Sequence, residues 1–343
     1  MAARTDSPAS PRADAAVLSR AQGCLMGQVA GDALGSLVEF RSAEEIARSH
    51  PGGVREMAVS PVWSTLPGQP TDDSELAILL ARSLVVRGTY DADAAAAAYA
   101  YWYSTGPYDM GQTTRQALSA AAADPKAPAR AARHAASRGS QANGSLMRCS
   151  PLGILGWRAS PAQVVHWART DSELTHPHPL CQEACATFVL AIGDAIAHGG
   201  PAERVYGVAL AWCEKESRDL GLAKLMREAA GAPPSDPSHR MGWVRIAFQN
   251  AFYQLLHAPD AGEAIRRTVS LGGDTDTNAA IAGALSGAVH GISSLPASWS
   301  QAVLSCRPEA GLPDVRRPRP QRLWATDLLE LASALAEAGP AGE

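Results

Sequence analysis

The sequence is poor in charged and aromatic residues, and its charges of opposite sign nearly cancel. Charged residues make up 19% and aromatic residues 6% of the 343 residues, and 30 Lys and Arg stand against 34 Asp and Glu. A protein that binds nucleic acid or an anionic membrane surface needs an excess of basic side chains on one face. The net charge of -4 argues against both partners, and we expect the short basic segment 316–322 to be a solvated turn.

Cysteine is sparse, and no long apolar run occurs. Six cysteines without a Cys-x-x-Cys pair are too few for a disulfide framework. Cys181 and Cys185 could be a metal or disulfide pair, but buried thiols on one helix face are the commoner outcome. No apolar run reaches the roughly 18 residues of a membrane span, and residues 1–14 lack the apolar region of a secretory signal. We therefore expect a monomeric cytoplasmic protein outside the membrane.

Apolar residues recur at spacings of three and four along most of the chain, whereas strict alternation is rare. This spacing predicts an all-α fold, and the 46% hydrophobic content is enough for a large core. The expected helices span residues 14–34, 74–86, 111–123, 179–197, 243–256, 261–270, 277–289 and 324–336.

Glycine and proline clusters separate these helices, but the composition on either side of each cluster is the same. We therefore expect a flexible N-terminal tail over residues 1–13 and a single domain over residues 14–343. A division into two α-helical subdomains stays open at this length. The longest irregular stretch, residues 231–240, is expected to be a surface loop.

Two acidic segments stand directly before apolar helical runs. They contain Thr71, Asp72, Asp73, Asp274, Asp276 and Thr277. Either segment alone is also what an ordinary helix N-cap with an acidic first turn looks like. Together they offer four carboxylates and two hydroxyls, which are the hard oxygen ligands that Mg²⁺ or Mn²⁺ prefers. Because four crowded carboxylates repel one another, we expect two divalent cations here.

Two glycine-rich stretches accompany the acidic segments. Small residues recur every three or four positions between Gly23 and Gly35, which favours close helix packing, and Glu39 follows as a carboxylate that could point into a site. In the second stretch Asn143 and Gly144 mark a turn, and Ser145 could begin a helix whose free N–H groups bind a phosphate.

Six motifs in this order resemble those of the ADP-ribosylglycohydrolase family, which includes hydrolases of ADP-ribosyl-arginine and ADP-ribosyl-serine. The motifs are Gly27–Gly35 with Glu39, Thr71–Ser74, Gly106–Gly111 with Thr113 and Thr114, Asn143–Arg148, Leu174–Pro177 and Gly272–Thr277. Together they extend over most of the chain. The ordered set is specific, whereas any one motif is not.

The resemblance implies a compact orthogonal multi-helix bundle with a central dinuclear metal cleft. It makes the six residues of the acidic segments metal ligands, and it leaves the proton-transferring carboxylate open among Glu39, Asp109 and Asp274. The residues that it places around ADP-ribose are Gly106, Asp109, Gly111, Asn143, Gly144, Ser145, His176 and Gly273.

The implied reaction is metal-dependent hydrolysis of the bond at C1 of the distal ribose of an ADP-ribosylated protein, with ADP-ribose as product. We expect an arginine linkage. A hydrolase of serine-linked or O-acetyl ADP-ribose and a non-catalytic ADP-ribose-binding protein are the alternatives. Asp274 and Asp276 also match the Asp-x-Asp motif of haloacid-dehalogenase phosphotransferases, but that motif follows a strand, and here it follows two glycines in helical surroundings.

Overall fold

The computed structural model describes residues 13–219 and 221–339, which form sixteen α-helices and three short 3-10 helices. Within these residues the β pairing is limited to two isolated bridges, Ser42 with Gly272 and Ala142 with Trp243. The expected all-α fold is confirmed. Of the expected tail, residues 1–12 lie outside the described residues, and the single domain stays a prediction.

The helices follow the chain with short connections between most of them. They are α1 (Ala15–Gly35), α2 (Ala43–Ser49), α3 (Asp72–Arg87), α4 (Ala92–Ser104), α5 (Gln112–Ala123), α6 (Pro128–Ala135), α7 (Ser150–Leu155), η1 (Gly156–Arg158), α8 (Pro161–Glu173), α9 (Pro179–His198), α10 (Ala202–Lys215), α11 (Leu222–Gly231), α12 (Val244–His257), α13 (Ala261–Ser270), α14 (Thr275–His290), η2 (Ile292–Ser294), α15 (Ala297–Ser305), η3 (Gln321–Leu323) and α16 (Leu328–Ala338).

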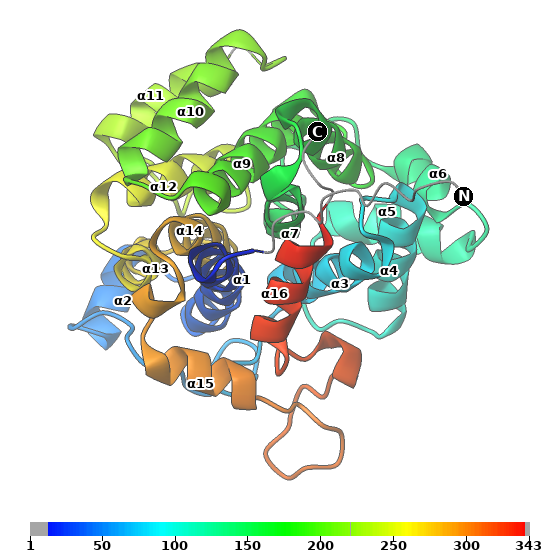
Figure 1. The fold of residues 1–343 in the computed structure, drawn as a ribbon. Coiled ribbons are helices and arrows are strands. Elements are labelled where there is room, and N and C mark those ends of the chain that lie inside the picture. Colours follow the sequence, from blue (N-terminus) through cyan, green and yellow to red (C-terminus); the bar gives the residue numbers. More distant parts are fainter. Residues whose placement is uncertain (1–12, 220, 340–343) are drawn as a thin grey trace, which may run out of the picture.

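Helices α1 and α14 lie side by side at the centre of the bundle and form its most extensive helix pair (Figure 1). They run antiparallel, because Gly23 faces Gly287, Gly27 faces Gly283 and the C-terminal Gly35 faces Thr275. A Cβ atom at Gly27 would overlap the carbonyl group of Gly283. The small residues therefore allow backbone-to-backbone contact, and this contact brings the end of α1 to the beginning of α14.

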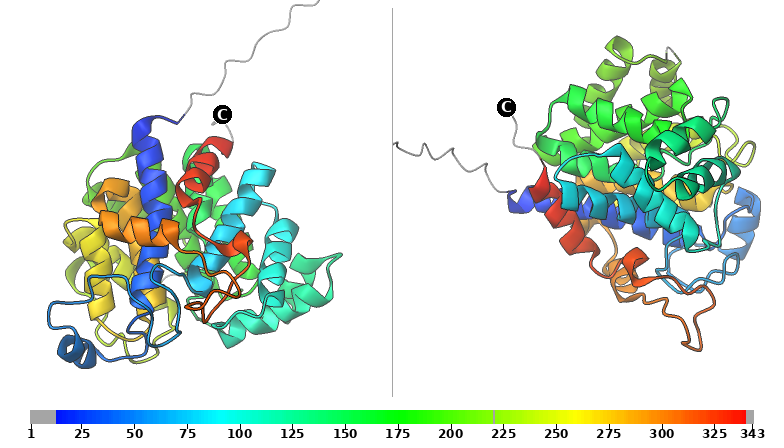
Figure 2. Two further views of the ribbon diagram at one scale, coloured as in Figure 1. Left: turned by 90° about the horizontal axis from the view of Figure 1, so that it is seen from below. Right: turned by 90° about the vertical axis from the view of Figure 1, so that its right-hand side faces the viewer.

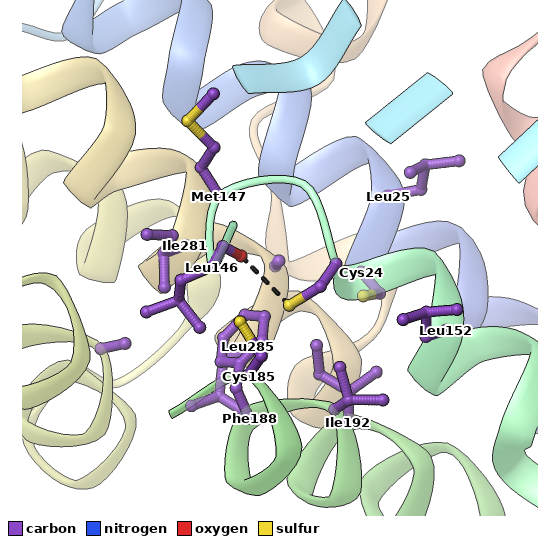
Figure 3. Packing of buried hydrophobic residues seen from close by; sticks show 14 of the residues in the cluster. Cys24, Leu25, Leu146, Met147, Leu152, Cys185, Phe188, Ile192, Ile281 and Leu285 are labelled. Carbon is purple, nitrogen blue, oxygen red and sulfur yellow. Dashed lines mark hydrogen bonds between the residues drawn. The ribbon is translucent and has the colours of Figure 1, made fainter. Parts of the chain in front are cut away.

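The other helices surround this pair. Helices α9, α12 and α13 contact α14, while α16 contacts both α1 and α3. Helices α10 and α11 lie at one edge of the molecule, and α15 with the following loop lies at the opposite edge (Figures 1 and 2). Figure 3 shows Leu146 among Cys185, Phe188 and Leu285 in the core, whereas Met147 points away from this cluster. Leu146 thus anchors the loop before α7 from beneath.

One of the sequence expectations about the C-terminal region is wrong, and another, the solvated turn at 316–322, holds except at Arg319. The segment 324–327 is not helical, because the Arg82 guanidinium binds the carbonyl oxygens of Arg322 and Trp324 and the Asp327 carboxylate. These carbonyl oxygens consequently accept hydrogen bonds from Arg82 and not from helical N–H groups, and α16 begins only at Leu328. In the basic segment, Arg319 is 6% exposed and forms an ion pair with the buried Glu75 at 2.7 Å. This turn is therefore partly internal.

The six cysteines are buried and unpaired, as expected of packed thiols. Helix α9, which carries Cys181 and Cys185, is by length and composition long and apolar enough to cross a membrane. However, 83% of its most apolar window is buried inside the protein. The apolar surface of α9 is thus covered by neighbouring helices.

We predict that Gly27→Ala destabilises the protein and that Gly207→Ala does not. A methyl group at Gly27 meets the backbone of α14, and such overpacking costs about 1–3 kcal/mol or more. Gly207 lies on the exposed side of α10 with no atom within 4 Å of an added Cβ, so alanine there stabilises by up to about 1 kcal/mol. Urea unfolding of the two variants measures the difference. Equal stability of the two would contradict the close α1–α14 contact.

Candidate active site

A cavity of about 820 Å³ opens where the N-termini of α3 and α14 meet four loop segments. Its walls come from residues 39–40, 109–114, 139, 141–144, 147 and 240–243, and Asp72, His176, Asp274 and Thr277 complete its lining. This volume is in the range of small-molecule and cofactor sites. The cavity therefore unites motifs that are more than 200 residues apart in the sequence.

The acidic segments meet at the base of this cavity. Carboxylate oxygens of Glu39, Asp274 and Asp276 lie within 4.8 Å of one another. Asp72 and Asp73 begin α3 beside them, and all five side chains are buried. Five carboxyl groups in one buried place are far more than two helix caps require, and neither Thr71 nor Asp274 caps its helix through its side chain.

The pKa values of these groups respond to the crowding. Burial and, after it, neighbouring carboxylates raise the pKa of Asp72, Asp73 and Asp276 well above the ordinary range. Burial, with Asp109 and Asp274 nearby, raises the pKa of Glu39 to about 8. Burial, with Asp274 nearby, raises the pKa of Asp109 to about 6. Cations or protons are therefore needed to neutralise the cluster.

Some oxygens of the cluster have no hydrogen-bond donor. Among the described residues, Asp73 Oδ1 and Asp276 Oδ2 are buried without a partner. Asp274 Oδ2 accepts a hydrogen bond of 2.7 Å from Asn143 Nδ2, and Asp276 Oδ1 accepts one from the backbone N–H of Thr277. Buried oxygens without donors are rare and costly, so these two positions suit a cation.

Asp32 holds the first acidic segment in place, a role that the sequence analysis did not assign. It lies in the last turn of α1, fully buried, and accepts hydrogen bonds from the backbone N–H groups of Thr71 and Ser74 and from the Thr71 hydroxyl at 2.9 Å. It thus caps α3 from another helix. The signal was present, because an Asp inside a stretch of small, packed residues needs buried donors.

Glu39 is held from two sides. Trp63 Nε1 donates to Glu39 Oε2 at 2.5 Å. On the other side, the next residue, Phe40, donates its N–H to the carbonyl oxygen of Gly273, and Gly273 donates to Arg41. This backbone pairing joins the Glu39 segment to the second acidic segment. Nothing in the sequence near Trp63 pointed to this contact.

Five of the eight residues expected around ADP-ribose line the cavity, and three do not. Those that line it are Asp109, Gly111, Asn143, Gly144 and His176. Gly106 lies outside the lining, and a Cβ at Gly273 would overlap the carbonyl of Pro237. Gly273 therefore allows the loop between α11 and α12, residues 232–243, to approach. The stretch 231–240 is thus not only surface, because it contributes Arg240 to the cavity.

Ser145 does not begin a helix, in contrast to the sequence expectation. Residues after Asn143 form turns, since the N–H groups of Leu146 and Met147 both donate to the Asn143 carbonyl, and α7 begins only at Ser150. The Ser145 hydroxyl is fully buried and lies 2.9 Å from the Ser172 hydroxyl. It supports the loop from inside.

Comparison with known proteins agrees with this geometry. The sequence profile of the family described as ADP-ribosylglycohydrolase matches residues 13–341. The chain belongs to the ADP-ribosylglycohydrolase family. The ADP-ribosyl-[dinitrogen reductase] glycohydrolase of Rhodospirillum rubrum is 31% identical over 284 residues, 82% of this chain and 90% of that protein.

Two further relatives place this ADP-ribosylglycohydrolase among enzymes. The ADP-ribosylarginine hydrolase Tri1 of Pseudomonas putida is 25% identical over 303 residues, 83% of this chain and 74% of that protein. A solved structure titled ADP-ribosylglycohydrolase-related protein complex superimposes with a TM-score of 0.75 at 26% identity, covering 94% of this chain and 99% of that chain. The protein is thus a hydrolase of glycosidic bonds.

The residues at the base of the cavity fit the metal dependence of the ADP-ribosylglycohydrolase family. The cluster presents oxygen donors alone, as hard divalent cations require, and two of these oxygens lack any other partner among the described residues. A cluster of this kind without cations keeps protons on several of its carboxyl groups.

We predict that the stability of the metal-free ADP-ribosylglycohydrolase decreases as the pH rises from about 4 to 8. Ordinary carboxyl pKa values lie near 4, so in this interval the folded state, with Glu39 at about 8, binds more protons than the unfolded chain. Melting temperatures in chelator at pH 5 and pH 8 measure this effect, and Mg²⁺ or Mn²⁺ should raise the melting temperature more at pH 8.

The variant Asp276→Asn removes one of the mutually repelling carboxylates and should flatten this pH dependence. A metal-free melting temperature that instead rises between pH 5 and pH 8, and that metal leaves unchanged at both, would show that the cluster is neither strained nor a cation site.

Proposed function

We propose that this enzyme removes ADP-ribose from modified arginine side chains of proteins by hydrolysing the bond at C1 of the distal ribose. The observation that carries the proposal is the buried acidic cluster at the base of a cavity of about 820 Å³, with a further carboxylate, Asp109, on the wall. The named activities of the relatives support it, since one is a glycohydrolase of ADP-ribosyl-[dinitrogen reductase] and another a hydrolase of ADP-ribosylarginine.

We assign two divalent cations, Mg²⁺ or Mn²⁺, to the ligands Thr71, Asp72, Asp73, Asp274, Asp276 and Thr277. Such cations supply Lewis acidity that orients the ribose hydroxyls and lowers the pKa of water. The two unpartnered oxygens, Asp73 Oδ1 and Asp276 Oδ2, support this assignment. Asp32 contributes indirectly, because it fixes the backbone of Thr71 and Ser74 at the beginning of α3.

Proton transfer requires a carboxyl group whose pKa is close to the working pH. Glu39, with a pKa raised to about 8, and Asp109, with one raised to about 6, both meet this requirement and both line the cavity. The pKa of Asp274 is also raised by burial, against the opposing hydrogen bond from Asn143. We propose that one of these three moves the proton between water and the leaving group.

The arginine linkage rests on the position of Asp109. Its carboxylate lies on the cavity wall, where it could meet the group attached to C1 of the ribose. A guanidinium forms a charge-assisted and often bidentate hydrogen bond with a carboxylate. A serine oxygen gains nothing comparable, and the same holds for an O-acetyl group. Hydrolysis of these linkages is the second candidate, and binding of ADP-ribose without turnover is the third.

We propose that the enzyme works on protein substrates as a monomer in the cytoplasm. The net charge of -4, without a basic excess, argues against nucleic acid as a partner.

We predict that Asp73→Asn and Asp276→Asn each abolish hydrolysis of ADP-ribosyl-arginine while leaving a folded helical protein. Each change removes a cation ligand, yet it relieves repulsion between buried carboxylates and so preserves stability. Turnover, bound metal and circular dichroism are measured for each, with the exposed Asp314→Asn as the matched control. Chelator should act on the wild type as these variants do. Variants that unfold would show that the carboxylates serve the fold, and full turnover in chelator would exclude metal catalysis.

We predict that arginine-linked ADP-ribose is hydrolysed about tenfold to a hundredfold faster than serine-linked ADP-ribose, and that Asp109→Asn removes the preference. This ratio corresponds to about 1.5–3 kcal/mol for a hydrogen bond to a charged group. Initial rates on arginine- and serine-modified peptides measure it. Equal initial rates of the wild type on the two peptides would contradict the role of Asp109 in recognising the linkage. A preference for the serine peptide that survives the substitution would contradict it as well.

A further inference from the structure

We propose that Arg148 and Thr175 fix His176 as a neutral imidazole with its proton on Nε2, so that His176 donates a hydrogen bond into the cavity to an oxygen of the ligand. The identity of that ligand as ADP-ribose rests on the proposed function, whereas the position of the proton does not. Arg148 and Thr175 act through His176 and are positioning residues.

Arg148 cannot reach the ligand, because it is fully buried behind the loop that begins at Asn143. Its Nε donates to Asp171 Oδ2 at 3.0 Å, and its Nη2 donates to the Asp171 carbonyl oxygen at 2.8 Å. The guanidinium carbon lies 4.5 Å from the centre of the Tyr99 ring, whose hydroxyl also donates to Asp171. These contacts fix the plane and position of the guanidinium group.

The remaining nitrogen of this group determines the direction of the next hydrogen bond. Arg148 Nη1 lies 2.9 Å from Thr175 Oγ1, and since a guanidinium only donates, the hydroxyl oxygen accepts. Thr175 is fully buried, and among the described residues the other polar contact of its hydroxyl is His176 Nδ1 at 2.8 Å. The Thr175 hydrogen therefore points to Nδ1.

A nitrogen that accepts carries no proton, so a neutral His176 ring has its hydrogen on Nε2. The opposite arrangement, with Nδ1–H donating to Thr175, would leave the hydroxyl hydrogen buried without an acceptor, which is costly. Protonation of both nitrogens is opposed as well, because burial and the nearby Arg148 lower the pKa of His176 to about 3. The ring is thus a neutral donor over the working pH range.

The Nε2 edge of the His176 ring faces Gly144, in the loop that lines the cavity. His176 lines the cavity, and a Cβ at Gly144 would lie 2.9 Å from its Cε1 and 3.2 Å from its Nε2. The lack of a side chain at Gly144 therefore leaves this edge open. Arg148 Nη1 also approaches the Gly144 carbonyl at 3.4 Å, so one guanidinium positions both the ring and the loop beside it.

The proton position is tested by ¹⁵N NMR of the histidine rings in the metal-free, ligand-free protein. Nine histidines are present, and the signals lost in His176→Asn assign those of His176. We expect the Nε2–H tautomer, unchanged between pH 5 and 8. Thr175→Val should shift the population towards Nδ1–H, and Thr175→Ser should restore the wild-type pattern. A proton on Nδ1 in the wild type would overturn the proposal, as would a Thr175→Val variant that folds and keeps pure Nε2–H.

The direction of the bond is tested by calorimetry with ADP-ribose in the presence of Mg²⁺. A Gln amide reaches the position of Nε2 and donates there, whereas an Asn amide reaches only that of Nδ1. We expect His176→Asn to weaken binding about fivefold, the effect of one neutral hydrogen bond of about 1 kcal/mol, and His176→Gln to recover most of it. Equal losses in the two variants would contradict donation from Nε2. If the wild type does not bind ADP-ribose at all, the proposed function fails, while the NMR result still decides the proton position.

Discussion

The close antiparallel contact between α1 and α14 is the constraint on which the site depends. Because glycines face glycines along this interface, the two backbones touch, and the end of α1 lies beside the beginning of α14. Asp32, on α1, then caps α3, and Glu39 follows α1 directly into the cluster with Asp276. A larger separation of the two helices would move Asp32 and Glu39 away from the residues they serve, so the same small residues determine both the core and the chemistry.

The crowded acidic groups that we assign to cation binding also lower the stability of the fold. Each carboxyl group in the cluster is buried among others of the same charge, and each raised pKa measures the free energy that ionisation costs there. The surrounding helices supply this energy, since most of their apolar residues lie in one continuous core around α1 and α14. In the absence of cations, the repulsion between these buried carboxylates therefore lowers the stability of this fold.

The sequence predicted the fold class and the acidic base of the cavity, because helical periodicity and paired Asp residues are local signals. It could not predict contacts across the chain. Trp63 reaches Glu39 from a loop without any pattern, and the buried pair of Arg319 with Glu75 joins segments 244 residues apart. The same limit explains Ser145, whose turn is stabilised from beneath by Ser172 and by the packing of Leu146, neither of which is visible in the motif itself.

Basic side chains of the protein would compete with divalent cations for the carboxylates of the cluster. The positions of the basic side chains prevent this competition. Among the described residues that line the cavity, Arg240 is the only Arg or Lys, and its guanidinium lies over Trp243 at the rim, 5.5 Å from the ring centre. The charge of Arg148 is engaged by Asp171 behind the wall. A neutral donor such as His176 can therefore bind a ligand oxygen in the cavity that the acidic cluster also lines without forming an ion pair with its carboxylates. A positive charge on His176 would stabilise the ionised form of the carboxyl groups in the cavity. It would thereby reduce the stabilisation that divalent cations add. Keeping the imidazole neutral separates recognition of the ligand from neutralisation of the cluster.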